Sequence, residues 1–236
     1  MNEAMLTQLT DGLRQMGLDA SRPGVPKVAE YIARMLEKNR VMNLSAIREP
    51  EAAVRLHALD ALSIFGCLDL AGKQVLDVGT GGGVPGALLA LYEPDAHVSM
   101  LDSTAKKLAF VEDCCRDLGA AADFYAVRAE ELAQGAKREN FDVVTARAVA
   151  ALPALCELCM PFVKVGGVFA AYKANAAEEL AAAEKAIRVL GGRALKPFAY
   201  KIPGEAAARC ILLIEKIAPT PAQYPRAWAK IKSRPL

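Results

Sequence analysis

The spacing of apolar residues separates an N-terminal segment from the rest of the chain. Before residue 70, series that begin at Leu6, Val28 and Val54 place apolar side chains three or four positions apart. This is the spacing of helices that bury one face. Strand-like alternation does not occur before residue 74. The pattern therefore predicts a helical extension over residues 1–70.

From residue 74, short β-rich runs alternate with helical ones, which predicts a parallel sheet with helices on both faces. Two later strand-like runs are joined by Pro203-Gly204, a hairpin signal. We therefore predict an α/β, Rossmann-like class I methyltransferase fold, whose mostly parallel seven-stranded sheet ends in an antiparallel hairpin. The domain would span residues 71–218, followed by a basic tail over 219–236. Strands are predicted at 74–78, 98–101, 124–127, 141–145, 168–172, 194–202 and 210–216, and helices at 85–92, 105–118, 129–134, 151–164 and 175–190.

Composition narrows the class of protein. Apolar residues make up 53% of the 236 residues and charged residues 24%, which is typical of a globular chain. No apolar run reaches the roughly 18 residues of a membrane span, and the first residues lack a secretory signal. We expect a cytoplasmic protein with reduced, mostly buried cysteines. Cys156-x-x-Cys159 has no second pair and the chain holds 2 histidines, so we expect no metal. A monomer is expected, because no heptad repeat or large apolar stripe is apparent.

Charge is unevenly distributed along the chain. Residues 1–184 carry 18 basic against 25 acidic side chains, whereas residues 185–236 carry 11 against 2. A basic end on an otherwise acidic protein favours an anionic partner, with nucleic acid the first candidate. A solvated helix face followed by a disordered tail would give the same pattern.

The most informative segment runs from Val75 to Gly86, where a strand hands over to a helix. Such a turn is the ligand-binding place of an open α/β sheet, and glycines let a ligand approach the backbone. Gly81, Gly83 and Gly86 also satisfy the G-x-G-x-x-G pattern of dinucleotide sites.

Two acids help to choose between the cofactors. Asp77 would repel a pyrophosphate but favour the cationic groups of S-adenosylmethionine. Asp102 ends the next strand and can accept hydrogen bonds from a ribose, which both cofactors carry. Glu130 follows the third strand, where it could reach an adenine edge or simply favour a helix N-terminus. The Asp77 carboxylate therefore favours S-adenosylmethionine as the cofactor.

The end of the fourth strand indicates the acceptor. It lacks the Asn/Asp-Pro-Pro-aromatic motif of many amino-group methyltransferases, and the chain has no Pro-Cys pair for pyrimidine C5 chemistry. It carries Arg147, and Lys173 ends the fifth strand. Guanine N7 has a free lone pair and needs no general base, so alignment would supply most of the catalysis. We predict Arg147 and Lys173 as catalytic residues that hold the base or a phosphate, although either could be a solvated cation.

From about residue 40 onward the chain resembles the bacterial 16S rRNA guanine-N7 methyltransferases, also called the glucose-inhibited division protein B family. The resemblance rests on Asn43–Arg48, His57-x-x-Asp60, Asp77–Gly86, Leu101-Asp102-Ser103 with Lys106-Lys107, Arg128-Ala129-Glu130, Thr145–Ala148, Arg209 and Tyr224-Pro225-Arg226.

This resemblance implies S-adenosylmethionine as cofactor and one guanine of 16S rRNA, or of the small ribosomal subunit, as substrate. With the glycine turn, it predicts cofactor binding by Asp77, Gly79, Gly81, Gly83, Val84, Asp102, Ser103, Thr104, Ala129, Glu130 and Arg147. RNA contacts are predicted at Arg48, His57, Lys173, Arg209 and Arg226.

The chain departs from the family pattern at Ala61, Ala174 and Ala227–Ala229, which leaves RNA contacts near the C-terminus less defined. Two other functions stay open. A small-molecule methyltransferase would leave the basic C-terminal quarter unexplained. A nucleotide-binding regulatory module would bind without chemistry.

Overall fold

The computed structural model describes residues 3–236. Its strands form one β-sheet with both parallel and antiparallel pairs. The strand order is β3-β2-β1-β4-β5-β8-β6, with β7 also paired to β8. Strands β1 to β5 pair in parallel, and β8 runs antiparallel to β5, β6 and β7. The strands are β1 (Gln74–Val78), β2 (His97–Leu101), β3 (Ala122–Tyr125), β4 (Phe141–Arg147), β5 (Val163–Lys173), β6 (Gly192–Ala194), β7 (Phe198–Tyr200) and β8 (Arg209–Lys216).

This sheet confirms the predicted fold class, with one difference in strand count. The run predicted as one strand over 194–202 is divided into β6 and β7 by residues 195–197. Pro197 lies in this break, and proline has no N–H to donate to a neighbouring strand. The described chain therefore has an eight-stranded sheet instead of the expected seven. The order reverses between β2-β1 and β1-β4, which opens a crevice at the carboxyl ends of these strands.

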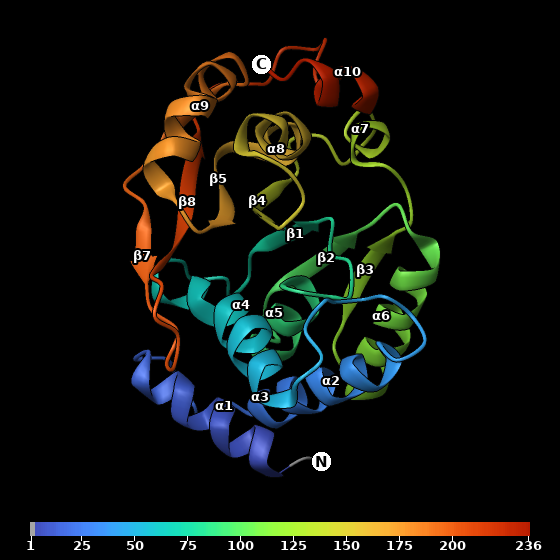
Figure 1. Cartoon of the computed structure of the whole chain (residues 1–236). Coiled ribbons are helices and arrows are strands. Elements are labelled where there is room, and N and C mark those ends of the chain that lie inside the picture. Colours follow the sequence, from blue (N-terminus) through green and yellow to red (C-terminus); the bar gives the residue numbers. More distant parts are fainter. Residues whose placement is uncertain (1–2) are drawn as a thin grey trace.

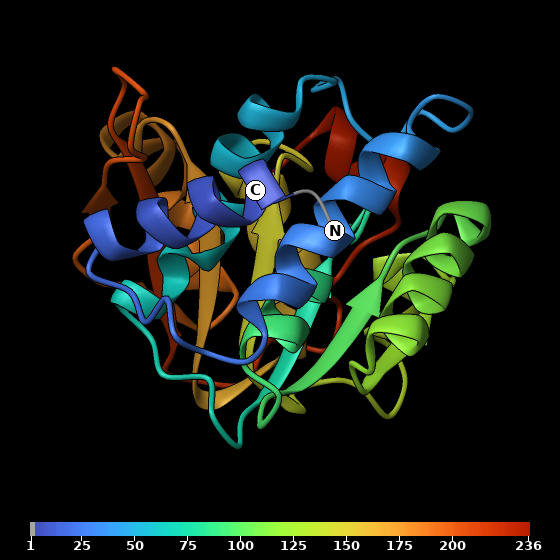
Figure 2. The same cartoon turned by 90° about the horizontal axis from the view of Figure 1, so that it is seen from below.

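Helices cover both faces of the sheet (Figures 1 and 2). Successive residues of each strand point to opposite faces. Val75 thus packs with the N-terminal helices, whereas Leu76 packs with α8 and α9. One face of the sheet carries α1 (Glu3–Gln15), α2 (Val25–Lys38), α3 (Pro50–Ala53), the π-helical turn η1 (Val54–Leu59), α4 (Asp60–Leu62), η2 (Ser63–Gly66), α5 (Gly86–Tyr92) and α6 (Ala105–Leu118). The other face carries α7 (Ala129–Leu132), α8 (Leu152–Cys159), η3 (Met160–Phe162), α9 (Ala176–Val189) and α10 (Trp228–Ser233).

No helix within residues 3–236 has the length and apolar character needed to cross a membrane.

The predicted N-terminal extension is helical and belongs to the main core. Leu9 and Leu13 of α1 and Ile32 of α2 are fully buried in the same apolar cluster as Leu88 of α5. The phenol of Tyr31 is also buried, and its hydroxyl donates to the carbonyl of Gly82 over 2.8 Å. Helix α2 therefore supports the glycine turn directly.

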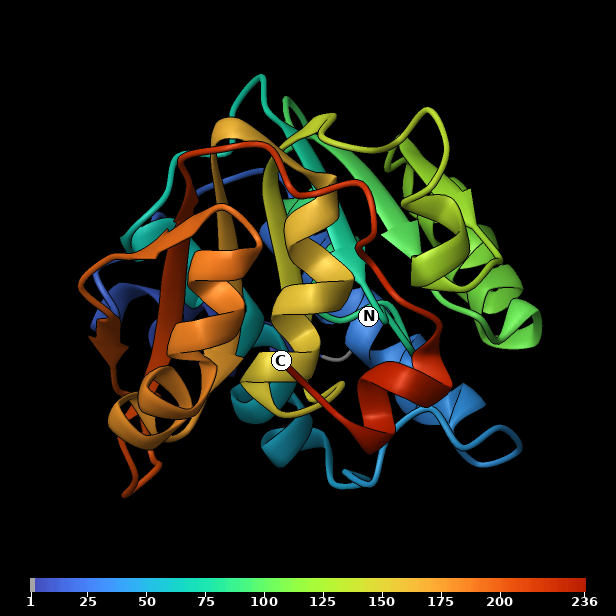
Figure 3. The ribbon, with the colours of Figure 1, turned by 90° about the horizontal axis from the view of Figure 1, so that it is seen from above.

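The basic tail is ordered in the structure and crosses the outer face of α8 (Figure 3). Arg138 holds the start of this segment by donating to the carbonyls of Thr220 and Tyr224 at 2.7 and 2.8 Å. The segment ends in α10, whose Ile231 is fully buried against the α8 side of the core. The final helix is thus fixed at the carboxyl edge of the sheet.

Candidate cofactor and substrate site

A cavity of about 440 Å³ opens at the carboxyl ends of β1, β2 and β4. It lies in the crevice expected from the reversal in strand order. The turn after β1, the end of β2, the start of α7, the segment after β4, and α8 and α10 all contribute to its wall. The lining residues are Val78, Gly79, Gly81, Leu101, Asp102, Ser103, Lys107, Val127, Arg128, Ala129, Glu130, Ala148, Val149, Leu158 and Trp228.

Gly79 and Gly81 present bare backbone to the cavity. Their φ angles are +75° and +56°, a region in which residues with a Cβ are strained. A Cβ on Gly79 would also lie 2.6 Å from Cγ2 of Val149. The two glycines therefore keep open a space that any other residue would fill.

Asp102 lies on the cavity wall directly beside the glycine turn. Its Oδ2 accepts a hydrogen bond from the N–H of Gly81 at 2.9 Å, and its Oδ1 accepts one from the N–H of Thr104 at 2.8 Å. Each carboxylate oxygen keeps a second lone pair, which suits the two hydroxyls of a ribose. Ser103 is on the cavity wall, whereas Thr104 contributes through its backbone and does not line the space.

The start of α7 forms the wall predicted to face an adenine. Ala129 and Glu130 both line the cavity, and Glu130 is buried. The Nε of Arg128 donates to Glu130 Oε1 at 2.6 Å. This pair leaves the second carboxylate oxygen of Glu130 available for a further donor.

The second half of the glycine turn faces the protein interior. Gly83 has a φ of +87°, and a Cβ there would lie 1.9 Å from the hydroxyl oxygen of Tyr31. Val84 is buried, and neither residue lines the cavity. Gly83 is therefore required by its close approach to Tyr31 of α2, and Val84 is part of the apolar core; direct cofactor contact by either stays a prediction.

Asp77 is also placed behind the turn. Its carboxylate is fully buried and accepts hydrogen bonds from the N–H of Gly86 and from Oγ1 of Thr145, both at 2.9 Å. Burial raises the pKa of this carboxyl. Asp77 thereby ties β1 to β4 and to the start of α5, and direct contact with the cofactor stays a prediction.

Arg147, predicted to act on cofactor and substrate, points toward the N-terminal helices. Its guanidinium donates to the carbonyl of Leu56 at 2.8 Å and to Asp60 Oδ2 at 2.9 Å, and it lies 2.8 Å from His57 Nδ1. Its side chain is 17% exposed, and it is not on the cavity wall. The residues that follow it, Ala148 and Val149, do line the cavity.

His57 is held between two partners. Because the arginine always donates, His57 Nδ1 accepts and the neutral ring carries its proton on Nε2. That nitrogen lies 2.7 Å from Ser45 Oγ. Burial, with a smaller effect of the Arg147 charge, lowers the pKa of His57 to about 4. His57 is therefore neutral and fully hydrogen-bonded at physiological pH.

Asp60 completes this group of side chains, which we call the Arg147 network (Ser45, His57, Asp60, Arg147, Tyr200 and Arg209). The Asp60 carboxylate is 1% exposed. Its Oδ1 accepts from the hydroxyl of Tyr200 at 2.7 Å and lies 3.5 Å from Arg209. Two predicted RNA contacts, His57 and Arg209, are thus engaged within the protein.

Lys173 and Arg226 are engaged as well. The Nζ of Lys173 donates to the carbonyl of Ala150 at 2.9 Å and to Glu179 Oε1 at 2.8 Å. Arg226 binds the fully buried carboxylate of Glu157, with Nε to Oε1 at 2.7 Å. Lys173 therefore holds the segment after β4, and Arg226 anchors the tail. Their predicted catalytic and RNA-binding roles are not tested by these contacts and stay predictions.

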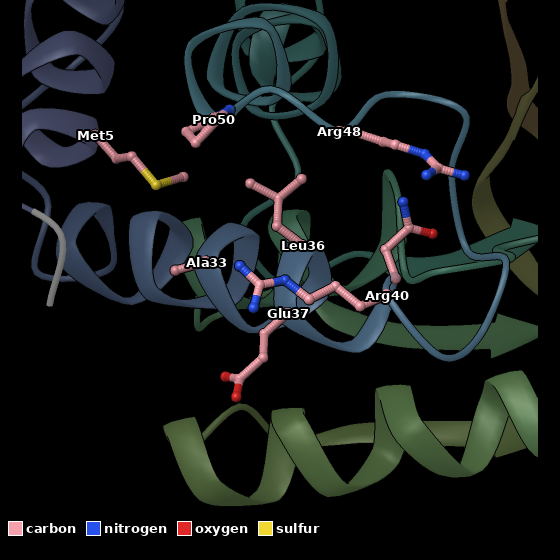
Figure 4. Close-up of a pocket in the computed structure, with 8 residues that line it drawn as sticks. Met5, Ala33, Leu36, Glu37, Arg40, Arg48 and Pro50 are labelled. Atoms are coloured by element: carbon pink, nitrogen blue, oxygen red, sulfur yellow. The ribbon is translucent and has the colours of Figure 1, made fainter.

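Arg48 is exposed and lines a different cavity of about 510 Å³ between α1, α2 and the segment that follows α2. Figure 4 shows the guanidinium groups of Arg40 and Arg48 directed to different sides, with Glu37 turned away from both. The charged groups do not converge on one point. Contact of Arg48 with RNA stays a prediction.

The cysteines are thiols, and five of the six are buried. Cys156 and Cys159 lie on α8 inside the core, where burial raises the pKa of both thiols. In the part of the chain that the structure describes, no three histidine, cysteine or acidic side chains gather as metal ligands.

Several wall residues were not predicted from the sequence. Leu158 and Trp228 reach the cavity from α8 and α10, and Val149 reaches it from the segment after β4. The Thr145–Ala148 motif predicts a site role for Arg147 alone, whereas the structure places Ala148 on the wall. An apolar residue within a charged tail, such as Trp228, was the one available signal for the contribution of α10.

Structural comparison shows the class of protein first. The fold is similar to an S-adenosylmethionine-dependent O-methyltransferase from Thermotoga maritima, with a TM-score of 0.52, 16% identity, and coverage of 79% of this chain and 72% of that one. It is also similar to a branched-chain polyamine synthase variant from Thermus thermophilus, with a TM-score of 0.60, 14% identity, and coverage of 85% and 66%. The fold is that of the class I methyltransferases.

Sequence comparison then shows the family. The family model described as rRNA small subunit methyltransferase G matches residues 25–203. A ribosomal RNA small subunit methyltransferase G from Exiguobacterium is 38% identical over 100% of both chains. One from Alkaliphilus oremlandii is 39% identical over 97% of both chains. This chain belongs to that family, and it is an S-adenosylmethionine-dependent methyltransferase.

The cavity fits this cofactor. The glycine turn offers exposed backbone, Asp102 offers acceptors for ribose hydroxyls, and Glu130 offers an acceptor for an amino group. Leu101 and Leu158 provide apolar walls for a purine.

Proposed function

We propose that this protein transfers a methyl group from S-adenosylmethionine to N7 of one guanine in 16S rRNA. We further propose that it acts as a monomer in the cytoplasm, where ribosomal RNA is found. The observation that carries the proposal is the cavity at the end of β1, β2 and β4, in a chain whose family is described as rRNA small subunit methyltransferase G.

The chemistry of the cavity supports an acceptor that needs no general base. S-adenosylmethionine supplies a methyl group on a positively charged sulfur. The N7 lone pair forms the new bond to carbon while the carbon–sulfur pair returns to sulfur, and no proton is removed. The two carboxylates on the wall, Asp102 and Glu130, already accept hydrogen bonds from Gly81, Thr104 and Arg128. Their places suit cofactor binding better than proton transfer.

The segment after β4 is the proposed seat for the base. Val149 is 37% exposed at the cavity edge. Lys173 holds the neighbouring carbonyl of Ala150, and Arg147 holds the strand end that precedes it. In this proposal Arg147 and Lys173 are positioning residues, which fix the seat without touching the methyl group.

Exposed cations are available to contact RNA phosphates. Of the 11 basic residues in 185–236, Arg193, Arg209, Lys216 and Arg226 form ion pairs within the chain. The remaining seven are exposed and form no ion pair with another residue of the described range: Lys185, Arg188, Lys196, Lys201, Lys230, Lys232 and Arg234. We propose that Lys230 and Lys232, on α10 beside the cavity, bind the backbone of the RNA.

Methylation of 16S rRNA and of small subunits with labelled S-adenosylmethionine, followed by mass mapping, tests the proposal. One 7-methylguanosine in RNA is expected. The single-turnover rate should vary little between about pH 6 and 9, because no catalytic group titrates there. A rate that rises tenfold per pH unit would indicate a deprotonation step and a different acceptor. Labelled small molecules without labelled RNA would favour the small-molecule alternative.

Charge-removal variants separate RNA binding from cofactor binding. Replacing Lys230 and Lys232 with alanine should weaken RNA binding and reduce its salt dependence by about one unit of slope per lost contact. Lys73→Ala is the matched control, since Lys73 is exposed just before β1, at the opposite edge of the sheet. Equal effects of the two changes would contradict the assignment of this RNA-binding surface.

A further inference from the structure

The wall of the cofactor cavity contains one aromatic side chain within residues 3–236, and it comes from the C-terminal helix. Trp228 begins α10, lines the cavity and packs at its inner edge against the α8 side of the core. It is also the single tryptophan of the chain. Neither the glycine turn nor the sheet explains why an indole is placed there.

The segment that carries Trp228 is fixed rigidly enough to form part of a binding site. Arg226, two residues earlier, donates from its backbone N–H at 2.9 Å and from its guanidinium to the buried carboxylate of Glu157. Ile231, three residues later, is fully buried. Anchors on both sides therefore hold the indole at the cavity.

The other wall residues define what the indole can meet. Asp102 and the Val127–Glu130 segment offer the polar groups suited to a ribose and to the edge of a purine, while Leu158 adds an apolar surface next to Trp228. A purine face needs a flat apolar partner, and an indole is the largest that a side chain can offer.

We propose that Trp228 packs its indole against the adenine of S-adenosylmethionine, so that α10 is a working part of the cofactor site. This inference rests on the identity of the cofactor and not on the acceptor proposed above. It predicts that removal of residues 222–236 lowers cofactor affinity as well as RNA affinity.

Ligand titrations without RNA test the proposal and stay informative if the acceptor is wrong. S-adenosylhomocysteine and 5′-methylthioadenosine are the probes, because both carry the adenosyl group and only the first carries the amino acid. Each should change the fluorescence of Trp228 on saturation. By calorimetry, Trp228→Ala should weaken binding of both probes about tenfold, in the range of base–aromatic stacking. Trp228→Phe should restore most of the affinity.

Ala229→Ser, at the exposed neighbouring position of α10, is the matched control and should bind both probes as the wild type does. Thermal unfolding would show that each variant is folded. Wild-type affinity in a folded Trp228→Ala, or unchanged fluorescence at saturation, would overturn the proposal. A loss confined to S-adenosylhomocysteine would also overturn it, by placing the indole beside the amino acid instead.

Discussion

The cofactor cavity and the Arg147 network are neighbours at the end of β4, yet they use recognisable residues in opposite ways. In the cavity, Gly79 and Gly81 present backbone without a side chain, and Asp102 keeps lone pairs free beyond its hydrogen bond with the N–H of Gly81. In the network, the guanidinium of Arg147 donates to three partners, and Asp60 and His57 are occupied on both sides. Charged motif residues close to the cavity are therefore not all directed into it, and those of the Arg147 network are engaged by other protein groups.

The largest expected effect comes from closing the open side of the cavity. Gly79→Ala combines a positive φ with a Cβ 2.6 Å from Val149. We expect affinity for S-adenosylhomocysteine, measured by calorimetry, to fall by at least about a hundredfold.

Gly72→Ala is the matched control for that change. Gly72 has a similar φ of +68°, with no atom within 4 Å of an added Cβ. It should cost about 1 kcal/mol of stability and leave cofactor affinity unchanged. Similar losses of affinity in both variants would mean that backbone strain, and not the cavity, decides binding.

Breaking the network should reduce stability instead of ligand affinity. Asp60→Asn removes the buried carboxylate that pairs with Arg147, and we expect unfolding free energy in urea to fall by about 3 kcal/mol. Asp11→Asn, in the exposed Arg14 pair, should change it little. A folded Asp60→Asn of normal stability that fails to bind cofactor would remove the distinction between the two regions.

The pH dependence of the free energy of unfolding should show that the pKa of His57 is lowered on folding. Its pKa falls from 6.5 to about 4 on folding, so the unfolded chain binds the proton more readily. The contribution of His57 to the free energy of unfolding is therefore fully present above about pH 6.5 and is lost as the pH falls toward 4. We expect a loss of about 2 kcal/mol between pH 7.5 and 5.

His57→Gln should remove this part of the pH dependence, as seen in urea unfolding at both pH values. His97→Gln, at the exposed histidine that begins β2, should not. An unchanged pH profile in His57→Gln would show that other groups are responsible.

The smallest effect is expected at Asp77. It lies behind the cavity wall, and asparagine can still accept from Gly86 and donate to Thr145. We expect Asp77→Asn to cost less than about 1 kcal/mol of cofactor affinity, because only its charge is lost. Asp102→Asn, on the wall itself, should cost about 1.5 kcal/mol. The reverse order by calorimetry would place Asp77 in direct contact with the cofactor.

The sequence predicted the sheet well because short β-rich runs, several of them bounded by glycine or proline, are local signals. β1 and α6 match the predicted bounds, and the break between β6 and β7 lies at Pro197, which has no N–H to donate to a neighbouring strand. For the site, the turn at Gly79–Gly81 and the acid at Asp102 were predicted from the same local chemistry.

The partners of the charged residues could not be predicted in this way. Arg147 meets Leu56, 91 positions earlier, and Arg226 meets Glu157, 69 positions earlier. Side chains that meet across such distances leave no periodic trace in one sequence. The short α10 has too few residues for a helical pattern, so the contribution of Trp228 became visible only in three dimensions.

The hydrogen bond from Tyr31 to Gly82 has a consequence for how the site opens and closes. Glycine turns are commonly the parts of a protein whose amide protons exchange fastest, because little holds them. Here α2 covers the turn and shares a core with α5. The amide of Gly83, which donates to Thr80, should exchange with deuterium at the slow rate of the core. We therefore expect the glycine turn and the N-terminal helices to unfold together as one cooperative unit.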